Sequence, residues 1–354
     1  MSGNGPIAVA MSGGVDSSVA AMRLVESGQP VFGLMLRLWS APGVTNRCCS
    51  PADVERARRV ARDLEIPFYV LDAQQPFRES VVRVFLDGYA HGMTPNPCIE
   101  CNRQIRWSHL LTAALSMGAS RLATGHYARL EETDDGPILR RAVDRSKDQS
   151  YVLGMLGGHE LSLSCFPLGS LTKTEVRDEA HRQGLAVADR AESQDLCFLG
   201  GRDYREVLQE LDGSSLTPGP ILDPAGSLMG EHQGLARYTI GQRKGIGIAG
   251  PQAYYVIEKD LARNALIVGP RSSLGRTELR TGPTNWVAGK APPLPRELEV
   301  QIRYRAPARL ARVAPMENGG MRVTLLEPAP DVTPGQYAMF YDGDRCLGGG
   351  MILP

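Results

Sequence analysis

The segment Ser12–Ser18 reads Ser-Gly-Gly-Val-Asp-Ser-Ser and lies between a short apolar run, Ile7–Ala10, and a stretch with helical spacing. Its two glycines allow the backbone to approach an anion closely. Its serines offer hydroxyl donors, and the helix that follows points the positive end of its dipole at the loop. The pattern predicts a phosphate site. Asp16 repels phosphate, so we interpret it as a Mg²⁺ ligand or as a residue that orients the loop. The segment lacks the lysine of a Walker A sequence, which argues against a P-loop kinase.

Seven cysteines form the second group with possible chemistry. Their number is odd, and no basic start with an apolar run marks a signal peptide, so we expect a reducing, cytoplasmic compartment. Cysteines that cluster, such as the Cys-x-x-Cys pair Cys98 and Cys101, are therefore interpreted as catalytic or metal-binding rather than as a disulfide scaffold. Four others are interpreted as small loop or packing residues: Cys48, Cys49, Cys165 and Cys346.

Strand and helix patterns alternate over the first part of the chain and must position these groups. Apolar runs predict strands at 7–10, 31–36, 67–71 and 121–124. Helical spacing and caps predict helices over 17–27, from Ser50 onward, over 105–117, 172–184 and 204–211. Buried strands that alternate with helices indicate a doubly wound parallel sheet, whose ligands bind at the carboxyl ends of the strands.

Short alternating runs, rich in Gly and Pro, replace this pattern after about residue 205. We expect a hairpin over 254–268 and strands over 298–305, 310–313, 321–326 and 337–341, with a turn at Asp342-Gly343. The predicted organisation is a catalytic domain over 1–204, a central β-rich domain over 205–277 and a β-barrel over 278–354.

The charge balance excludes an overtly basic protein, because the formal net charge is zero. A nucleic-acid partner would therefore be held by local patches of Arg and Lys. No stretch approaches the about 20 apolar residues that span a bilayer, so we expect no membrane association. A monomer is expected.

The phosphate loop resembles the PP-loop of ATP pyrophosphatases, which implies an adenine nucleotide alpha hydrolase-like fold. Further blocks are similar to the tRNA-specific 2-thiouridylases, and they extend from residue 10 to residue 350. They are residues 94–102 (TPNPCIECN), 123–128 (ATGHYA), 146–151 (SKDQSY), 166–173 (FPLGSLTK), 193–198 (SQDLCF), 238–247 (YTIGQRKGIG), 334–336 (PGQ) and 346–350 (CLGGG).

This resemblance implies ATP-dependent adenylation of O2 of uridine 34 in a tRNA anticodon, followed by sulfur transfer to C2. It implies that Cys101 is the nucleophile and that Cys197 carries a persulfide. The implied ATP contacts are Ala10, Met11, Ser12, Gly13, Gly14, Val15, Asp16, Ser17, Met35 and Gly125, with Mg²⁺. Asn96, Pro97 and Cys98 would approach the target base. The implied tRNA contacts are His126, Lys147, Asp148, Gln149, Arg303, Tyr304 and Gln336. The implied partners are tRNAs of the Lys, Glu and Gln type and a sulfur donor such as a cysteine desulfurase or a sulfur-relay protein.

Cys98 departs from much of this family, which has Asp at that position, and three hypotheses follow. Cys101 and Cys197 use the persulfide route and alternate with a disulfide, while Cys98 is a spectator or a resolving thiol. Alternatively, the three cysteines hold a [4Fe-4S] cluster with one open iron for hydrosulfide. A structural zinc half-site is the third hypothesis, but zinc needs four ligands and no second Cys-x-x-Cys exists.

Two other functions remain open on the sequence alone. One is a PP-loop ligase for a small metabolite, of the argininosuccinate synthetase type. The other is a nucleotide-gated RNA-binding module. Taken singly, several residues also have plain structural interpretations: Met35 in a strand core, His126 in a loop, Lys147–Gln149 in a solvated turn, and Arg303 and Arg305 on the wet face of a strand.

Overall fold

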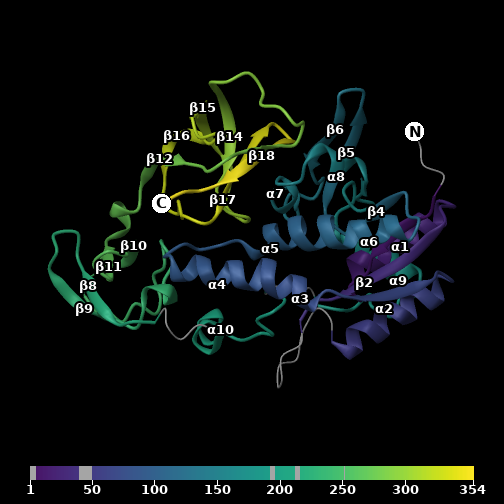
Figure 1. Cartoon of the computed structure of the whole chain (residues 1–354), viewed down its shortest axis with the longest axis horizontal. Coiled ribbons are helices and arrows are strands. Elements are labelled where there is room, and N and C mark those ends of the chain that lie inside the picture. The colour runs from purple at the N-terminus through teal and green to yellow at the C-terminus, as the bar shows by residue number, and fades with distance from the viewer. Residues whose placement is uncertain (1–4, 40–49, 192–195, 212–215, 251) are drawn as a thin grey trace.

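The structure is a computed structural model that describes residues 5–39, 50–191, 196–211, 216–250 and 252–354. Figure 1 shows three parts: an α/β layer that contains the N-terminal strands, a small green sheet from the middle of the chain, and a yellow-green β domain that ends at the C-terminus. Two long helical segments cross the molecule between the β domain and the lower edge. Within these described ranges, no helix is both long and apolar enough to cross a membrane.

The N-terminal sheet is parallel and has the order β3-β2-β1-β4-β7. Its strands are β1 (Ile7–Ala10), β2 (Val31–Arg37), β3 (Phe68–Asp72), β4 (Arg121–Ala123) and β7 (Ser164–Cys165). The four predicted apolar runs are confirmed as the strands β1 to β4. Apolar clusters pack against both faces of the sheet. The strand order reverses between β1 and β4, so the switch point for a ligand lies beside the loop after β1.

Four of the predicted helices form close to where they were expected. They are α1 (Val15–Glu26), α2 (Pro51–Asp63), α9 (Lys173–Arg182) and α10 (Tyr204–Leu211). The Ser50 side chain accepts a hydrogen bond from the Asp53 N–H, and Asp53 reaches back to the Ser50 N–H. Thr172 and Glu175 form the same reciprocal capping box. These local contacts satisfy backbone donors that a helix start leaves unpaired.

The predicted helix over 105–117 is longer than expected and changes type along its length. It begins as α5 (Pro97–Glu100), continues as the π-helix η2 (Cys101–Leu110) and ends as α6 (Leu111–Ser116). The Asn96 side chain caps its start by accepting from the Ile99 N–H. The helical segment before it, α3 (Gln74–Phe77), η1 (Arg78–Val82) and α4 (Arg83–Ala90), was not predicted. Two short helices, α7 (Ser150–Leu153) and α8 (Gly158–Ser162), were also missed.

A hairpin inside the N-terminal half belongs to the β sheet of the C-terminal domain. Its strands are β5 (Ala128–Thr133) and β6 (Gly136–Arg141), and β6 pairs antiparallel with β18 (Arg345–Met351). Arg140 and Arg129 both contact Asp344 through ion pairs at 2.6 Å. The first and last parts of the chain are thus joined by one sheet, which Figure 1 shows above α6 and α8.

The two remaining β regions follow the predicted pattern with one correction. The central sheet has the order β10-β11-β8-β9, from β8 (Gly219–Leu222), β9 (Leu228–His232), β10 (Tyr255–Asp260) and β11 (Ala265–Gly269). The C-terminal barrel-like sheet adds β12 (Arg276–Arg280), β13 (Asn285–Trp286), β14 (Arg296–Gln301), β15 (Arg309–Pro315), β16 (Met321–Ala329) and β17 (Tyr337–Asp342). The strand expected over 298–305 ends at Gln301, because the Gln301 amide turns back to donate to the carbonyls of Arg303 and Tyr304. Arg303 and Arg305 therefore do not lie on a strand face.

Candidate active site

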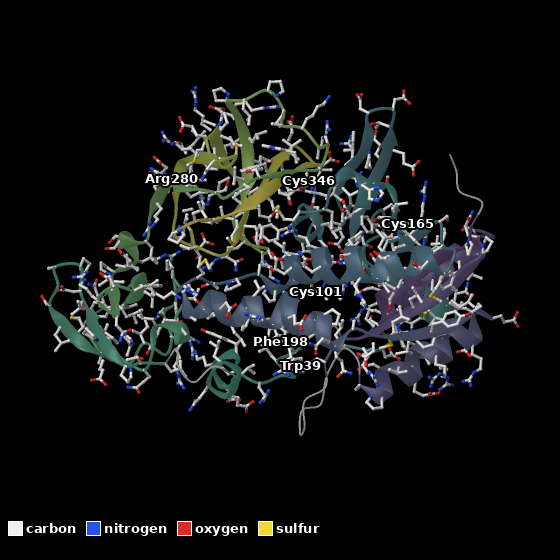
Figure 2. All side chains as sticks on the ribbon, in the orientation of Figure 1. Trp39, Cys101, Cys165, Phe198, Arg280 and Cys346 are labelled. Atoms are coloured by element: carbon white, nitrogen blue, oxygen red, sulfur yellow. The ribbon has the colours of Figure 1, made fainter. Side chains whose placement is uncertain are left out.

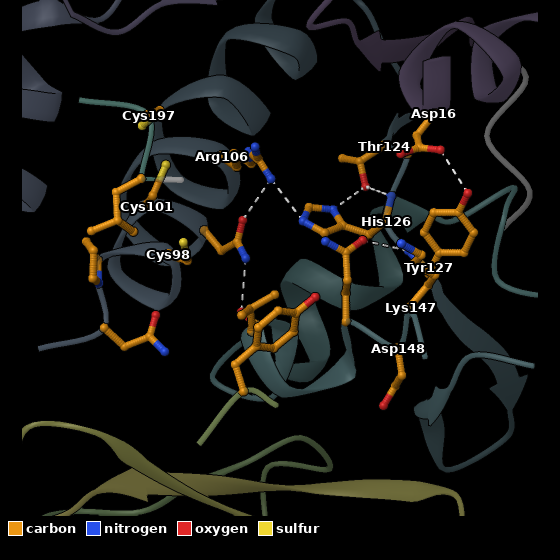
Figure 3. A pocket seen from close by; sticks show the side chains of 18 of the residues that line it. Asp16, Cys98, Cys101, Arg106, Thr124, His126, Tyr127, Lys147, Asp148 and Cys197 are labelled. Carbon is orange, nitrogen blue, oxygen red and sulfur yellow. Dashed lines mark hydrogen bonds between the residues drawn. The ribbon is translucent and has the colours of Figure 1, made fainter. Parts of the chain in front are cut away.

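A cavity of about 1850 Å³ opens at the carboxyl edge of the parallel sheet. The loop after β1, the start of α5 and the chain around Cys197 line it, and the segment after β14 closes it from the C-terminal domain. Figure 3 shows the cysteines at one side of this cavity and Asp16 at the other, with His126 between them. One space therefore holds both the predicted phosphate loop and the predicted sulfur chemistry.

The phosphate loop is shaped by its own side chains and leaves the start of α1 open. The Ser17 hydroxyl accepts from the Ser12 N–H at 3.1 Å and donates to the Gly14 carbonyl at 3.1 Å. Gly14 is the N-cap of α1, and no side chain caps that helix start. First-turn N–H groups of α1 are thus positioned for an anion, which is what a nucleotide phosphate requires.

Two glycines are required by close backbone approach. Gly13 has φ +69°, a left-handed conformation, and a Cβ atom there would lie 2.6 Å from the Asp53 carbonyl oxygen. At Gly125, in the loop after β4, a Cβ atom would lie 2.8 Å from both the Asp16 carbonyl carbon and the Ser17 nitrogen. The loops after β1 and β4 therefore touch at the switch point of the sheet.

Asp16 is held in place by two donors from outside the loop. Its Oδ1 accepts from the Lys173 ammonium at 2.6 Å and from the Tyr127 hydroxyl at 2.8 Å. This geometry fits the interpretation that Asp16 orients the loop, since both donors hold the same carboxylate oxygen. Lys173 and Tyr127 lie within two of the family-like blocks, and their spacing in the sequence does not predict contact with Asp16.

Arg190 is a second site residue that sequence reasoning missed. It donates to the Gly13 carbonyl and forms an ion pair with Asp53, which is 1% exposed. Burial alone would raise the pKa of Asp53, but hydrogen bonds from Ser50 and Arg56 and the charge of Arg190 hold that pKa below its ordinary value. An ionised Asp53 thus fixes Arg190 against the back of the phosphate loop.

Three cysteines line the cavity in different environments. Cys98 is exposed, Cys101 is 8% exposed and Cys197 is half-buried. Cys101 and Cys197 pack in the same apolar cluster, where the Phe198 ring meets those of Phe77 and Phe85 edge-on. Figure 2 shows Cys101 and Phe198 in the middle of the molecule, with Cys165 and Cys346 well away from them.

Neither a disulfide nor a metal-ligand cluster occurs among the described residues. Cys98, Cys101 and Cys197 line one cavity, but within the described residues they do not form a group placed to hold a single metal ion. The iron–sulfur cluster and the zinc half-site stay hypotheses. Burial raises the pKa of Cys165 and raises that of Cys346 to about 12, which keeps both as thiols. Cys48, Cys49 and the block residues Ser193–Asp195 lie outside the described ranges.

His126 lies at the centre of a hydrogen-bond chain across the cavity wall. It is 5% exposed, and its ring contacts the Thr124 hydroxyl at 2.7 Å and the Arg106 guanidinium at 2.9 Å. Burial first, and then the charge of Arg106, lower the pKa of His126 well below its ordinary value. His126 is therefore a neutral imidazole at physiological pH.

Most of the other predicted tRNA contacts line the cavity, and some of them also hold the structure together. Asn96, Pro97, Lys147, Asp148, Gln149, Tyr304 and Gln336 all line the cavity. Asp148 also accepts from Arg141 and Ser150, and Gln336 donates to the Thr94 carbonyl across the domain boundary. Burial, and then the neighbouring Cys98, raise the pKa of Tyr304, which lines the cavity together with Cys98.

Three predicted residues are not among those that line the cavity: Gly13, Met35 and Arg303. Met35 is 1% exposed within β2, as a core strand residue would be. Arg303 donates to the Ile240 carbonyl and to the Thr333 hydroxyl, and so joins the central region to the C-terminal domain. Their predicted contacts with ATP and tRNA stay predictions.

Comparison with known proteins covers the whole chain. Residues 6–201 match a model described as a tRNA methyl transferase HUP domain. Residues 205–270 match a tRNA methyl transferase PRC-barrel domain, and residues 276–352 an aminomethyltransferase beta-barrel domain. The tRNA-specific 2-thiouridylase MnmA of Roseiflexus sp. (strain RS-1) is 49% identical over 367 residues, which cover 98% of each chain. This chain belongs to the tRNA-specific 2-thiouridylase family.

A second member of the family, from Chloroflexus aurantiacus, is 47% identical over 350 residues and is also covered to 98%. The family resemblance predicted from the sequence blocks is confirmed. Among solved structures, an NMN synthetase from Francisella tularensis aligns with 61% of this chain and 80% of its own, at 20% identity and a TM-score of 0.35.

Proposed function

We propose that this protein is an ATP-dependent tRNA 2-thiouridylase that converts uridine 34 of the anticodon to 2-thiouridine. The observation that carries the proposal is that the phosphate loop and the cysteines Cys98, Cys101 and Cys197 line the same cavity. Near-full-length relatives named as tRNA-specific 2-thiouridylases support it. Two matching domain models are named for methyl transfer, but three thiols beside a nucleotide loop suit sulfur transfer better.

The first step activates the base. The uridine O2 atom attacks the α-phosphate of ATP, so that pyrophosphate leaves and an O2-adenylated base remains. The open start of α1, with Ser12 to Ser17 around it, would hold the phosphates, and Mg²⁺ would accompany ATP. Adenylation matters because it turns a poor oxygen leaving group into AMP.

The second step delivers sulfur by the persulfide route. The outer sulfur of a Cys197 persulfide attacks C2 of the activated base, and the C2–O bond to AMP breaks. The Cys101 thiolate then attacks the Cys197 sulfur, which releases 2-thiouridine and leaves a Cys101–Cys197 disulfide. An external dithiol must reduce this disulfide, and a protein that donates persulfide sulfur must reload Cys197.

Thiolation of an anticodon stem-loop tests the proposal. The purified protein receives ATP, a persulfide donor and dithiol, and the digested RNA is analysed by nucleoside mass spectrometry. We expect 2-thiouridine together with one pyrophosphate per modified base. Cys101→Ser should abolish the product, whereas Cys165→Ser, outside the cavity, should retain it. Pyrophosphate release without any change in the RNA mass would refute thiolation.

A further inference from the structure

The π-helix places Arg106 on the same side as the nucleophilic cysteine. In an α-helix, residues five apart point about 140° away from each other. In a π-helix the hydrogen bonds run from residue i to i+5, so residues five apart are about one turn apart. Cys101 and Arg106 are separated by five positions within η2, and both line the cavity. The unusual helix type thus has a specific geometric consequence at the site.

Arg106 is fixed by two acceptors before any substrate arrives. Its Nη1 donates to the His126 Nε2 at 2.9 Å and to the Asn102 Oδ1 at 3.2 Å. Because arginine only donates, His126 Nε2 must be the acceptor, and the ring proton lies on Nδ1 and is donated to the Thr124 hydroxyl. Asn102 is itself held by a 3.0 Å hydrogen bond to the Val152 carbonyl. Figure 3 shows this chain of contacts.

Arg106 differs from several other cations of the cavity wall in the kind of partner that it contacts. Three of them form ion pairs with carboxylates: Lys173 with Asp16, Arg190 with Asp53, and Arg141 with Asp148. Arg106 forms no ion pair within the part of the chain that the structure describes, and its two acceptors are a neutral imidazole and an amide. A positioned guanidinium with only neutral partners is a site for an anion.

We propose that Arg106 binds a phosphate group at the reaction centre, between the ATP loop and Cys101. The inference rests on the proposed thiolation. The shared chemistry is a phosphate oxygen facing a guanidinium fork. It has two possible sources: the phosphoryl group that links AMP to the activated base, or a backbone phosphate of the nucleotide that enters the cavity. Neutral His126 serves this role because a protonated ring would repel Arg106 instead of accepting its hydrogen bond.

Arg106→Met removes the charged guanidinium and keeps an unbranched side-chain stem, and Arg103→Met is the matched control. Arg103 lies on the same π-helix, is 39% exposed, does not line the cavity, and contacts Glu100, at 3.5 Å, and Tyr337. We expect Arg106→Met to lower kcat/KM for thiolation about 100-fold, as the loss of one preorganised donor to transition-state charge does. Arg103→Met should remain within a few-fold of wild type. Wild-type protein that makes no 2-thiouridine would refute the proposed function itself.

Two measurements separate the sources of phosphate. If the phosphate belongs to the adenylate, the pyrophosphate burst slows while the Kd for the stem-loop stays unchanged. If it belongs to the RNA backbone, the stem-loop binds more weakly. The slope of the logarithm of its affinity against the logarithm of the salt concentration then falls in magnitude by about 1. Both results support the inference. An Arg106→Met variant that is folded, thiolates like Arg103→Met and binds RNA normally would overturn it.

A measurement on the wild-type chain covers the case in which Arg106→Met fails to fold. Phenylglyoxal modifies accessible arginines, and peptide mass spectrometry reports the rate at each position. ATP or the stem-loop should slow the modification of Arg106 several-fold and leave that of Arg103 unchanged. Equal modification of Arg106 with and without both substrates would contradict phosphate binding there.

Discussion

Gly125→Ala tests whether contact between the two loops at the switch point is needed for ATP use. A Cβ atom at this position would lie 2.8 Å from the Asp16 carbonyl carbon and the Ser17 nitrogen and 3.1 Å from the Asp16 Cβ. Ordinary contact begins at 3.4 Å, so the loops must separate by about 0.6 Å. Most of these atoms are backbone at the start of α1 and cannot rotate away. Overpacking of this kind costs about 1–3 kcal/mol.

This cost should appear mainly in the use of ATP. A loss of about 1–3 kcal/mol corresponds to a fall in kcat/KM of about 5- to 150-fold. Pyrophosphate release at saturating stem-loop and varied ATP measures that fall directly. If part of the strain destabilises the folded chain instead, the thermal midpoint falls by a few degrees, since about 1 kcal/mol shifts a large domain by about 2–4 °C.

The matched control is Gly282→Ala, because a Cβ atom there meets the Leu353 side chain at an ordinary 3.7 Å. This variant should keep both the thermal midpoint and kcat/KM of wild type. The reasoning would be refuted if Gly125→Ala kept both the kcat/KM for ATP and the thermal midpoint of wild type. Contact between the two loops would then have no energetic role.

Four further outcomes are expected. Cys197→Ser should reduce 2-thiouridine to background while ATP binding persists, and nucleoside mass spectrometry with equilibrium dialysis would show both. The depressed pKa of His126 means that the unfolded chain gains a proton below about pH 6.5 and the folded chain does not. Stability should therefore fall with pH below about 6.5, by at most about 1.4 kcal/mol per unit, and urea titration of His126→Asn should show a shallower fall. Arg303→Ala should lower the free energy of unfolding by about 1.5–3 kcal/mol through lost contacts with Ile240 and Thr333, whereas unchanged urea midpoints would contradict that structural role. Anaerobically purified protein should contain no stoichiometric iron, and an iron-loaded, coloured protein would instead support the cluster hypothesis.

The parallel sheet, and the edge of it where the phosphate loop lies, were predictable because the sequence signals for them each span only a few residues. Apolar runs, the Ser50 N-cap, the Thr172–Glu175 capping box and the Gly-Gly loop each depend on residues a few positions apart. The residues that hold the phosphate loop were not predictable in this way. Lys173 meets Asp16 across 157 positions, and Arg190 meets the Gly13 carbonyl across 177. No periodicity or cap connects residues so distant in sequence.

The helix that carries the nucleophile shows a different limit of sequence reasoning. Its start was placed at 105 because apolar spacing begins there, whereas Asn96 and Pro97 provide the cap and first position. Its π geometry over Cys101–Leu110 has no known signature in residue types. The alternation of residues 128–141 was likewise not interpreted as a hairpin, although the Gly136 turn between β5 and β6 was a usable indication.

That hairpin explains why the cavity needs the C-terminal domain as well as the N-terminal one. Because β6 pairs with β18, the loop between β17 and β18 is held beside the ATP domain, and Asp344 bonds both Arg129 and Arg140. Tyr304 and Gln336 from the C-terminal domain then close the cavity over Cys98 and the phosphate loop. A nucleotide domain alone would leave the activated base open to water, which competes with sulfur for C2. The barrel-like domain therefore contributes to the site by enclosing it.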